Sequence, residues 1–363
     1  MSGPTESEVE SALREIIDPH TDQDPVKSKY VKNILVEGDR VTVDIQLGYP
    51  AKTWADEYAG MIRDKLAALD AASEVAVNVT SEIISHTVQK GVKPLPEVKN
   101  IIAVASGKGG VGKSTVAVNL ALALSADGAK VGILDADIYG PSQPRMLGVN
   151  AKPESKDGKS MEPLHSYHLQ SMSIGFLIDE ETPMIWRGPM VTQALEQLLK
   201  DTSWSDLDYL IIDLPPGTGD TQLTLAQRVP VSGAVIVTTP QDIALLDARK
   251  AYKMFEKVEI PILGVVENMS THICSQCGHE EHIFGEGGGQ RMAEEYGLNY
   301  LGSVPLDMQI RVDADGGRPT VVADPDGAVA STYRAIARRA AGKLATQKKD
   351  YSAKFPSIVI ESN

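Results

Sequence analysis

Cysteine is scarce in this sequence. Among 363 residues only two cysteines occur, Cys274 and Cys277, and both lie in one short segment, Cys-Ser-Gln-Cys. A secreted protein held together by disulfides would have more cysteines and would spread them along the chain. A single bond closing so short a loop could not stabilise a chain of this size. The pair therefore needs a chemical explanation.

Long hydrophobic runs are absent as well. No segment approaches about eighteen consecutive apolar residues, so no membrane-spanning helix is expected. The first residues, MSGPTESEVESALREI, carry acidic side chains where a secretory signal would have basic ones followed by an apolar core. We therefore expect a cytoplasmic protein with no membrane partner.

Positive charge is in deficit. The chain has 35 lysines and arginines against 49 aspartates and glutamates, a formal net charge of −14. Attraction to nucleic-acid phosphates relies on a basic face. Nucleic acid is therefore not an expected partner, and the acidic excess indicates a solvated surface.

The length suits one large domain and a smaller one. Residues 1–90 predict a small α+β domain, and the proline-bearing stretch 91–99 predicts a linker. In the small domain the hydrophobic spacing predicts helices at residues 8–17 and 54–69 and strands at 34–36, 41–47 and 75–79.

The pattern changes from residue 100 onward. Short apolar runs rich in β-branched residues recur at 101–105, 131–134, 209–212, 234–238, 262–266 and 300–304, with helix-length segments between them. This alternation predicts an α/β domain over residues 100–345 whose mostly parallel sheet is covered on both faces. The last helix, 328–345, has a narrow, alanine-rich apolar face. That face favours docking on the core, with its arginines in solvent, over a membrane or DNA contact. Residues 346–363 are expected to form a tail.

A phosphate-binding loop follows the strand at 101–105. The pattern G-x-x-x-x-G-K-[S/T] is met by Gly107, Gly112, Lys113 and Ser114, between a strand and an apolar helix. Glycines let backbone N–H groups point at phosphate oxygens, and the helix adds its positive end. We expect Lys113 to reach the β- and γ-phosphates of ATP, and the Ser114 hydroxyl to bind Mg²⁺. The residues expected to contact the nucleotide here are Gly107, Lys108, Gly109, Gly110, Val111, Gly112, Lys113, Ser114 and Thr115.

Carboxylates follow two of the predicted strands. Asp135 and Asp137 lie at the edge where open α/β sheets bind ligands and can orient the attacking water or the waters of Mg²⁺. Helix capping is the plainer alternative for both. Asp213 ends a hydrophobic strand, as a metal-holding carboxylate does, and we expect it to bind Mg²⁺ with Ser114. The loop after it contains Gly217, which can approach a γ-phosphate and move when that group leaves.

Three arrangements are open for the cysteines. One chain could bind zinc through Cys274, Cys277 and two of the nearby histidines, His272, His279 and His282. The pair could instead cycle as a redox dithiol. Two chains could also each contribute two cysteines to a shared four-thiolate site for zinc or a [4Fe–4S] cluster.

The phosphate loop carries an additional lysine, Lys108. The run from Lys108 to Lys113 resembles the deviant loops of the MinD/ParA/Mrp class. In that class the first lysine reaches across a dimer to the partner's nucleotide. The resemblance therefore implies an ATP-dependent homodimer, which would bring two copies of the cysteine loop together at little extra cost.

Further segments narrow the resemblance. They are DADIYGPSQP at 135–144, WRGPM at 186–190, DLPPGTGD at 213–220, ENMS at 267–270 and the Cys-x-x-Cys segment. With the phosphate loop they resemble the Mrp/ApbC family of iron–sulfur cluster carrier ATPases, over residues 100–344. The resemblance implies a [4Fe–4S] cluster bridging two chains and delivered to apo iron–sulfur proteins, with contacts to assembly factors. ATP binding and slow hydrolysis would act as the switch.

The family pattern also implies roles for individual residues. Lys108, Lys113, Asp137 and Asp213 would be catalytic, with Asp137 positioning water. Asn268, in the ENMS segment, would contact adenine, which residues 305–307 would flank.

The first domain resembles a small domain of iron–sulfur assembly proteins, with Ile17-Asp18-Pro19 where its helix ends. Relatives can carry a cysteine after the second strand, but residues 48–52 here are Gly-Tyr-Pro-Ala-Lys. An adapter or target-docking role is therefore expected for this domain.

Two other functions compete with a carrier. A positioning ATPase acting on DNA or membrane would share the loop and the switch segments, but it would have no use for Cys274 and Cys277. An ATP-dependent synthetic enzyme, similar to dethiobiotin synthetase, would need a second substrate pocket, and none is readable in the sequence.

Overall fold

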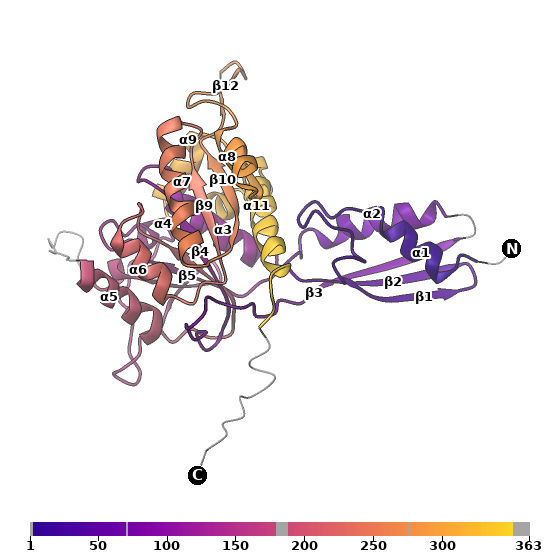
Figure 1. Ribbon diagram of the computed structural model, residues 1–363, viewed down its shortest axis with the longest axis horizontal. Coiled ribbons are helices and arrows are strands. Elements are labelled where there is room, and N and C mark those ends of the chain that lie inside the picture. Colours follow the sequence, from indigo (N-terminus) through magenta and orange to yellow (C-terminus); the bar gives the residue numbers. More distant parts are fainter. Residues whose placement is uncertain (1–2, 70–71, 179–187, 275, 351–363) are drawn as a thin grey trace, which may run out of the picture.

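Two lobes make up the protein in this computed structural model, which describes residues 3–69, 72–178, 188–274 and 276–350 (Figure 1). The segment 82–97 joins them. The predicted fold class, a mostly parallel α/β sheet preceded by a small α+β domain, is confirmed. None of the helices in these residue ranges combines the length and apolar character needed to cross a membrane.

The smaller lobe is a three-stranded sheet with two helices on one face. Its elements are α1 (Glu6–Leu13), β1 (Val31–Glu37), β2 (Arg40–Leu47), α2 (Ala55–Ala67) and β3 (Glu74–Ser81). The central strand β2 runs antiparallel to β1 and parallel to β3. Its alternate side chains, from Val41 to Leu47, are buried, as a sheet covered on one face requires.

The first helix differs from the range 8–17 that the sequence predicted. A capping box between Thr5 and Glu8 starts α1 earlier, at Glu6. The helix also ends earlier, at Leu13, and the chain turns toward Asp18. The Asp18 carboxylate accepts the backbone N–H of His20 at 2.9 Å, a local bond that competes with helix continuation.

The larger lobe is built on an eight-stranded sheet in the order β13-β10-β9-β4-β8-β5-β7-β6. Its strands are β4 (Val98–Ala105), β5 (Val131–Asp135), β6 (Leu164–Ser166), β7 (Leu169–Ser173), β8 (Leu207–Asp213), β9 (Gly233–Thr238), β10 (Ile262–Asn268) and β13 (Tyr300–Val304). All neighbouring pairs are parallel except β6 with β7. The sequence pattern did not predict this edge hairpin, because its strands are short and carry polar residues.

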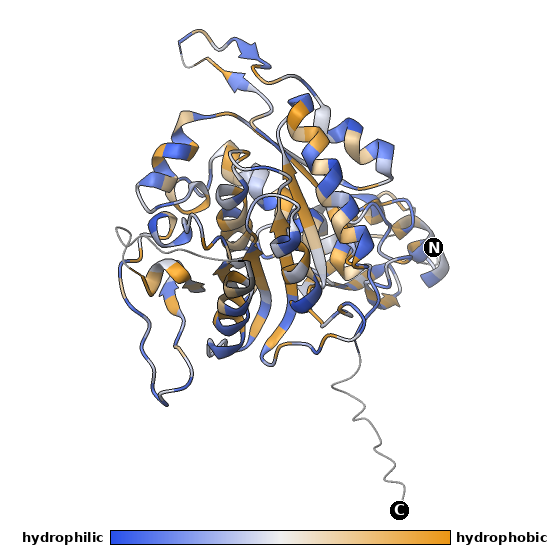
Figure 2. Cartoon of the chain, turned by 60° about the vertical axis from the view of Figure 1, so that its left-hand side comes forward, coloured by the Kyte–Doolittle hydropathy of each residue, from blue (hydrophilic) through white to orange (hydrophobic). Residues whose placement is uncertain are grey.

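Helices cover both faces of the large sheet, whose strands are hydrophobic in Figure 2. They are α3 (Lys113–Ala126), α4 (Gln143–Met146), α5 (Gly188–Asp201), α6 (Asp220–Arg228), α7 (Asp242–Lys257), α8 (Gly288–Tyr296), α9 (Met308–Asp315), α10 (Thr320–Ala323) and α11 (Ala328–Ala345), with a 3-10 turn at Ile174–Phe176. Successive side chains of β4 point to opposite faces of the sheet and so belong to different hydrophobic cores. Ile102 and Val104 pack with the core of α3 and α11, whereas Ile101 and Ala103 pack with the core of α5. A strand buried on both faces reads as a continuous apolar run, which is why the sequence revealed it.

Helix α11 lies between the two lobes (Figure 1). Its Arg338 donates to the Asp127 carboxylate at 2.7 and 3.1 Å, and Asp127 also accepts the Thr53 backbone N–H at 3.0 Å. Docking of this helix on the core agrees with the expectation, but the expectation that its arginines are solvated is wrong for Arg338, which is 8% exposed. The ion pair with Asp127, 211 positions away, offsets the cost of burying the guanidinium.

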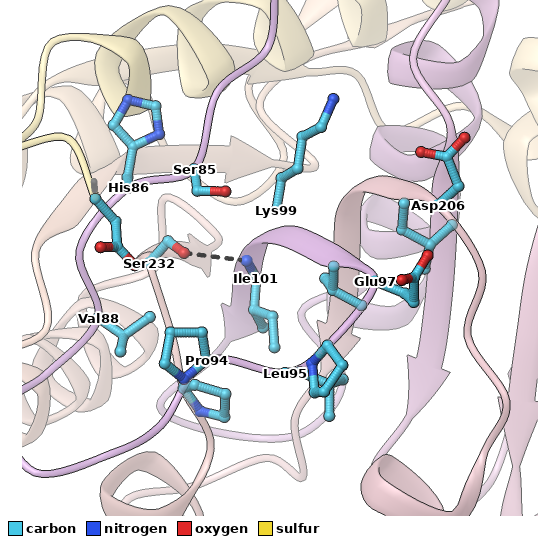
Figure 3. Close-up of a pocket in the computed structure, with 15 residues that line it drawn as sticks. Ser85, His86, Val88, Pro94, Leu95, Glu97, Lys99, Ile101, Asp206 and Ser232 are labelled. Atoms are coloured by element: carbon cyan, nitrogen blue, oxygen red, sulfur yellow. Dashed lines mark hydrogen bonds between the residues drawn. The ribbon is translucent and has the colours of Figure 1, made fainter. Parts of the chain in front are cut away.

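The connecting segment is fastened to the large lobe at two points. The side-chain oxygen of Asn100 accepts the backbone N–H of His86 at 3.1 Å. The same oxygen lies 2.9 Å from Nδ1 of the His86 ring. Gln89 donates to the carbonyls of Ala226 and Val229, each at 2.6 Å, at the end of α6. Between the segment and the sheet lies a pocket of about 310 Å³ (Figure 3).

Candidate nucleotide site and cysteine hairpin

The phosphate loop joins β4 to α3 at the carboxyl edge of the sheet. Gly110 and Gly112 have φ values of +82° and +78°, which glycine adopts without strain. A side chain on Gly107 would place its Cβ 2.1 Å from the backbone of Asp247. The loop therefore needs its glycines for both conformation and close approach, and the N-terminus of α3 begins directly at Lys113.

Lys113 is buried beneath this loop, with 5% of its surface exposed. Its ammonium forms an ion pair with the fully buried carboxylate of Asp213 and donates to Ser114 Oγ at 3.2 Å. The other oxygen of Asp213 accepts the amide of Gln143 at 2.9 Å. The structure thus brings together the three residues predicted to bind phosphate and Mg²⁺, and it adds Gln143, which sequence reasoning did not select. The sequence did hold a signal for Gln143, because this residue lies in the segment DADIYGPSQP at 135–144 that marks the family resemblance.

Asp135 is fully buried and accepts several hydrogen bonds. One oxygen accepts the backbone N–H groups of Ser142 and Gln143, at 2.9 and 3.0 Å, and the hydroxyl of Ser173 at 3.1 Å. Burial, and then the charge of Asp213, raise the pKa of Asp135 to about 7. Asp135 therefore anchors the loop that follows β5.

Asp137 lies on that loop and is half-buried. Burial raises its pKa, and the nearby positive charge of Lys113 opposes that shift. The segment around Gly217 lies beside the phosphate loop, because Gly217 N–H donates to Ser106 O at 2.9 Å. Lys108 is half-buried, and its carbonyl accepts the Ser106 hydroxyl at 2.9 Å. The residues predicted for catalysis and switching thus surround one loop.

Asn268 ends β10 and is 6% exposed. Its amide Nδ2 donates to the carbonyl of Val111 in the phosphate loop at 2.8 Å. The adenine contact that the family pattern implies for Asn268 stays a prediction. Of residues 305–307, Asp307 caps α9 by accepting Gln309 N–H at 2.7 Å.

The cysteines lie at the tip of a hairpin formed by β11 (His272–Ile273) and β12 (Glu280–Glu281). The hairpin projects from the top of the large lobe in Figure 1, and Figure 2 shows it extending beyond the body. Cys274 N–H donates to His279 O at 2.9 Å, and Gly278 N–H donates to Cys274 O at 2.8 Å. Backbone hydrogen bonds from Gln276 and Cys277 lower the pKa of Cys274. This shift favours the thiolate, the form that binds metals.

The single-chain zinc arrangement receives no support from the described residues. Among them, no three histidine, cysteine, aspartate or glutamate side chains are grouped so that they could hold a metal ion. The Nδ1 atoms of His272 and His282 instead lie 3.1 and 3.3 Å from the carbonyls of Leu306 and Ser270. Trp186 and Arg187 of the WRGPM segment lie outside the described residues.

Comparison with known families agrees with this geometry. Residues 97–341 match the family described as NUBPL iron-transfer P-loop NTPase. The chain belongs to this family. Residues 6–79 match a second family, described as iron-sulfur cluster assembly protein. The P-loop NTPase assignment applies to the larger lobe, and the smaller lobe corresponds to the assembly-protein match.

Curated relatives of this NTPase carry consistent names. An iron-sulfur cluster carrier protein of Pseudomonas fragi is 58% identical over 279 residues, covering 76% of this chain and 97% of the relative. A protein of the same name from Haemophilus influenzae is 46% identical over 345 residues, covering 95% and 93%. The mouse iron-sulfur cluster transfer protein NUBPL is 49% identical over 278 residues, covering 76% and 87%.

Solved structures share the fold of the larger lobe. A nucleotide-binding protein from Archaeoglobus fulgidus, in complex with ADP, is 38% identical, with a TM-score of 0.55 over 64% of this chain and 90% of that chain. The cell-division ATPase MinD of Pyrococcus furiosus is 23% identical, with a TM-score of 0.50 over 66% and 97%. The second likeness shows the fold alone.

Proposed function

We propose that this NTPase is an ATP-dependent iron–sulfur cluster carrier that holds a [4Fe–4S] cluster between two copies of the chain and transfers it to apo-proteins. The observation that carries the proposal is the position of the cysteine hairpin. It follows β10 directly, and Asn268 at the end of β10 touches the phosphate loop only six positions before Cys274. The names of the curated relatives support the same function.

The nucleotide site has the groups that ATP hydrolysis needs. On binding ATP, Lys113 would turn from Asp213 to the β- and γ-phosphates, for which its buried ammonium is suitably placed. Ser114 and Asp213 would then hold Mg²⁺, which neutralises phosphate charge. Asp137 would orient the attacking water, and the segment at Gly217 would respond to loss of the γ-phosphate. Coupling of hydrolysis to cluster transfer is part of the proposal.

A second copy of the chain is the partner that the larger lobe favours. Its exposed large apolar side chains lie on helices and loops that follow strands of the large sheet, and two of them, Ile273 and Ile283, lie on the cysteine hairpin. In the described residues they are Tyr139, Leu177, Met190, Ile243, Leu246, Ile273, Ile283, Met308 and Val312. Large apolar side chains left exposed are typical of an interaction surface. A twofold dimer through them would bring two cysteine pairs together, and Lys108 would face the partner's nucleotide.

The smaller lobe would serve recognition rather than ligation. Both cysteines of the chain lie in the larger lobe, so the smaller lobe has no thiolate to offer a cluster. We propose that it docks apo-protein targets or assembly factors. No observation favours a positioning ATPase, since the MinD likeness concerns the fold alone and the net charge is −14.

Anaerobic reconstitution tests the carrier function. Wild-type protein should bind about four iron and four sulfide ions per dimer and turn brown, because two chains supply the four thiolates of one cluster. Cys274→Ser and Cys277→Ser should each lose the chromophore and the iron. His279→Ala is the matched control and should retain both. Full iron binding by either cysteine variant would overturn the proposal, and metal loss by His279→Ala would favour the zinc arrangement.

A further inference from the structure

The hydrogen bond between Asn268 and the phosphate loop has a consequence for the cysteine hairpin. Asn268 Nδ2 reaches Val111 O at 2.8 Å, and the same nitrogen faces Gly112 so closely that a Cβ there would lie 2.1 Å away. Asn268 therefore touches the two residues directly before Lys113. Any adjustment of this loop around phosphates either moves the Asn268 amide or breaks its bond.

After Asn268, and before the hairpin begins, the chain is hydrogen-bonded to the end of the neighbouring strand β13. Met269 has a φ of +57°, which turns the chain sharply. Ser270 then donates its N–H and its hydroxyl to Val304 O, at 3.0 and 3.1 Å. Leu306 N–H donates to Thr271 O at 2.7 Å. Two backbone hydrogen bonds and one from the Ser270 hydroxyl thus hold the base of the hairpin to the end of β13 and the residues after it.

The hairpin itself transmits this position to the thiols. His272 and Ile273 pair with Glu281 and Glu280, and Cys274 is bonded to His279 across the turn. On the returning side, His282 Nδ1 lies 3.3 Å from Ser270 O. Only three residues, Met269 to Thr271, separate Asn268 from the β11–β12 ladder, so a displacement at Asn268 has a short path to the thiols.

We propose that Asn268 is a positioning residue that couples occupancy of the phosphate loop to the geometry of Cys274 and Cys277. The link from this coupling to cluster transfer rests on the proposed function. The coupling itself involves only the bound nucleotide and the two thiols. When Asn268 keeps its bond to Val111, the hairpin is in one position. When nucleotide phosphates reshape the loop, the hairpin takes another.

Thiol labelling of the metal-free, reduced full-length protein tests the coupling. The chain has only two cysteines, so the rate of alkylation by iodoacetamide reports on the hairpin alone. In wild type, saturating ADP or a non-hydrolysable ATP analogue should change that rate about fivefold or more, the lower end of ordinary coupling between two sites. Asn268→Ala and the isosteric Asn268→Asp, which lacks the amide donor, should lose this response at saturating nucleotide.

The matched control is Asn299→Ala. Asn299 donates its amide to Leu263 O at 3.0 Å, at the opposite end of β10 from the phosphate loop. This variant removes a similar bond to the same strand and should keep the wild-type response. Nucleotide affinity, measured separately by calorimetry, distinguishes coupling from binding.

The results separate this inference from the proposed function. A wild-type protein that binds nucleotide without changing its alkylation rate would overturn the inference, as would Asn268 variants that lose affinity yet respond fully once saturated. Neither result affects the carrier proposal. A normal labelling response in a protein that binds no iron on reconstitution would overturn the carrier function and leave the coupling standing.

Discussion

Three buried ionisable groups lie beneath the phosphate loop. Lys113 pairs with Asp213, and Asp135 lies close enough that the Asp213 charge contributes to raising its pKa to about 7. Lys113 is thus a single cation close to two buried carboxyl groups, those of Asp213 and Asp135. Because a buried charge is costly without a partner, Lys113 stabilises the fold as well as being placed to bind phosphate.

Removing Lys113 should therefore destabilise the nucleotide-free protein. We expect Lys113→Ala to lower the free energy of unfolding by about 3 kcal/mol, because it leaves the buried Asp213 carboxylate without its cation. Lys108→Ala, at a half-buried position of the same loop, should change it by less than about 0.5 kcal/mol. Urea unfolding without nucleotide measures both. A loss of no more than about 0.5 kcal/mol for Lys113→Ala would mean that the Lys113–Asp213 pair contributes nothing to stability.

At the scale of elements, α11 holds the lobes together. It packs against α3 and β13 in the larger lobe, and Lys343 pairs with Asp22 of the smaller lobe at 2.6 Å. Its buried Arg338 bonds Asp127, which in turn bonds Thr53 of the smaller lobe. Arg338, Asp127 and Thr53 thus join three separate segments where the two lobes meet.

Arg338→Ala should loosen the junction of the lobes. It leaves the Asp127 carboxylate buried without its cation, at a cost of about 3 kcal/mol. We expect a larger radius of gyration in small-angle scattering and faster proteolysis between the lobes. Arg334→Ala, one turn earlier on the same helix, is the control and should leave both unchanged, because half-buried Arg334 bonds Ser331 of the same helix and not the smaller lobe. An unaltered scattering profile for Arg338→Ala would contradict this role.

At the scale of the whole molecule, the contact between the lobes buries a histidine. His20 is 4% exposed and packs edge-on against Tyr49 and Trp54. In the described part of the chain neither ring nitrogen has a hydrogen-bond partner. Burial, and then the charges of Arg338 and Arg339, lower the pKa of His20 to about 3. The folded protein therefore keeps this ring neutral where an unfolded chain would protonate it.

This difference predicts a pH dependence of stability. Below the ordinary histidine pKa of 6.5, the unfolded state binds a proton that the folded state excludes until pH falls to about 3. The contribution of His20 is thus complete above pH 6.5 and declines as pH falls, by about 2–3 kcal/mol near pH 4.5. His20→Leu should remove this part of the slope in urea titrations between the two pH values. Parallel curves for variant and wild type would contradict the prediction.

The sequence by itself determined the phosphate loop and the strand pattern. The positive φ angles of Gly110 and Gly112 and the helix that starts at Lys113 are local properties, set by residues adjacent in the chain. The buried strands can be recognised in the sequence as continuous apolar runs, because helices cover both faces of the sheet. The carboxylates Asp135 and Asp213 end such strands and could be located for the same reason.

Only the tertiary structure decided which groups these residues meet. Lys113 pairs with Asp213 across 100 positions, Asn268 reaches Val111 across 157, and Arg338 finds Asp127 across 211. Such contacts depend on the order of strands in the sheet and on where α11 docks, and no local pattern encodes either. The same holds for the exposed apolar side chains, which are scattered in sequence. Their exposure depends on which side chains the folded chain leaves uncovered.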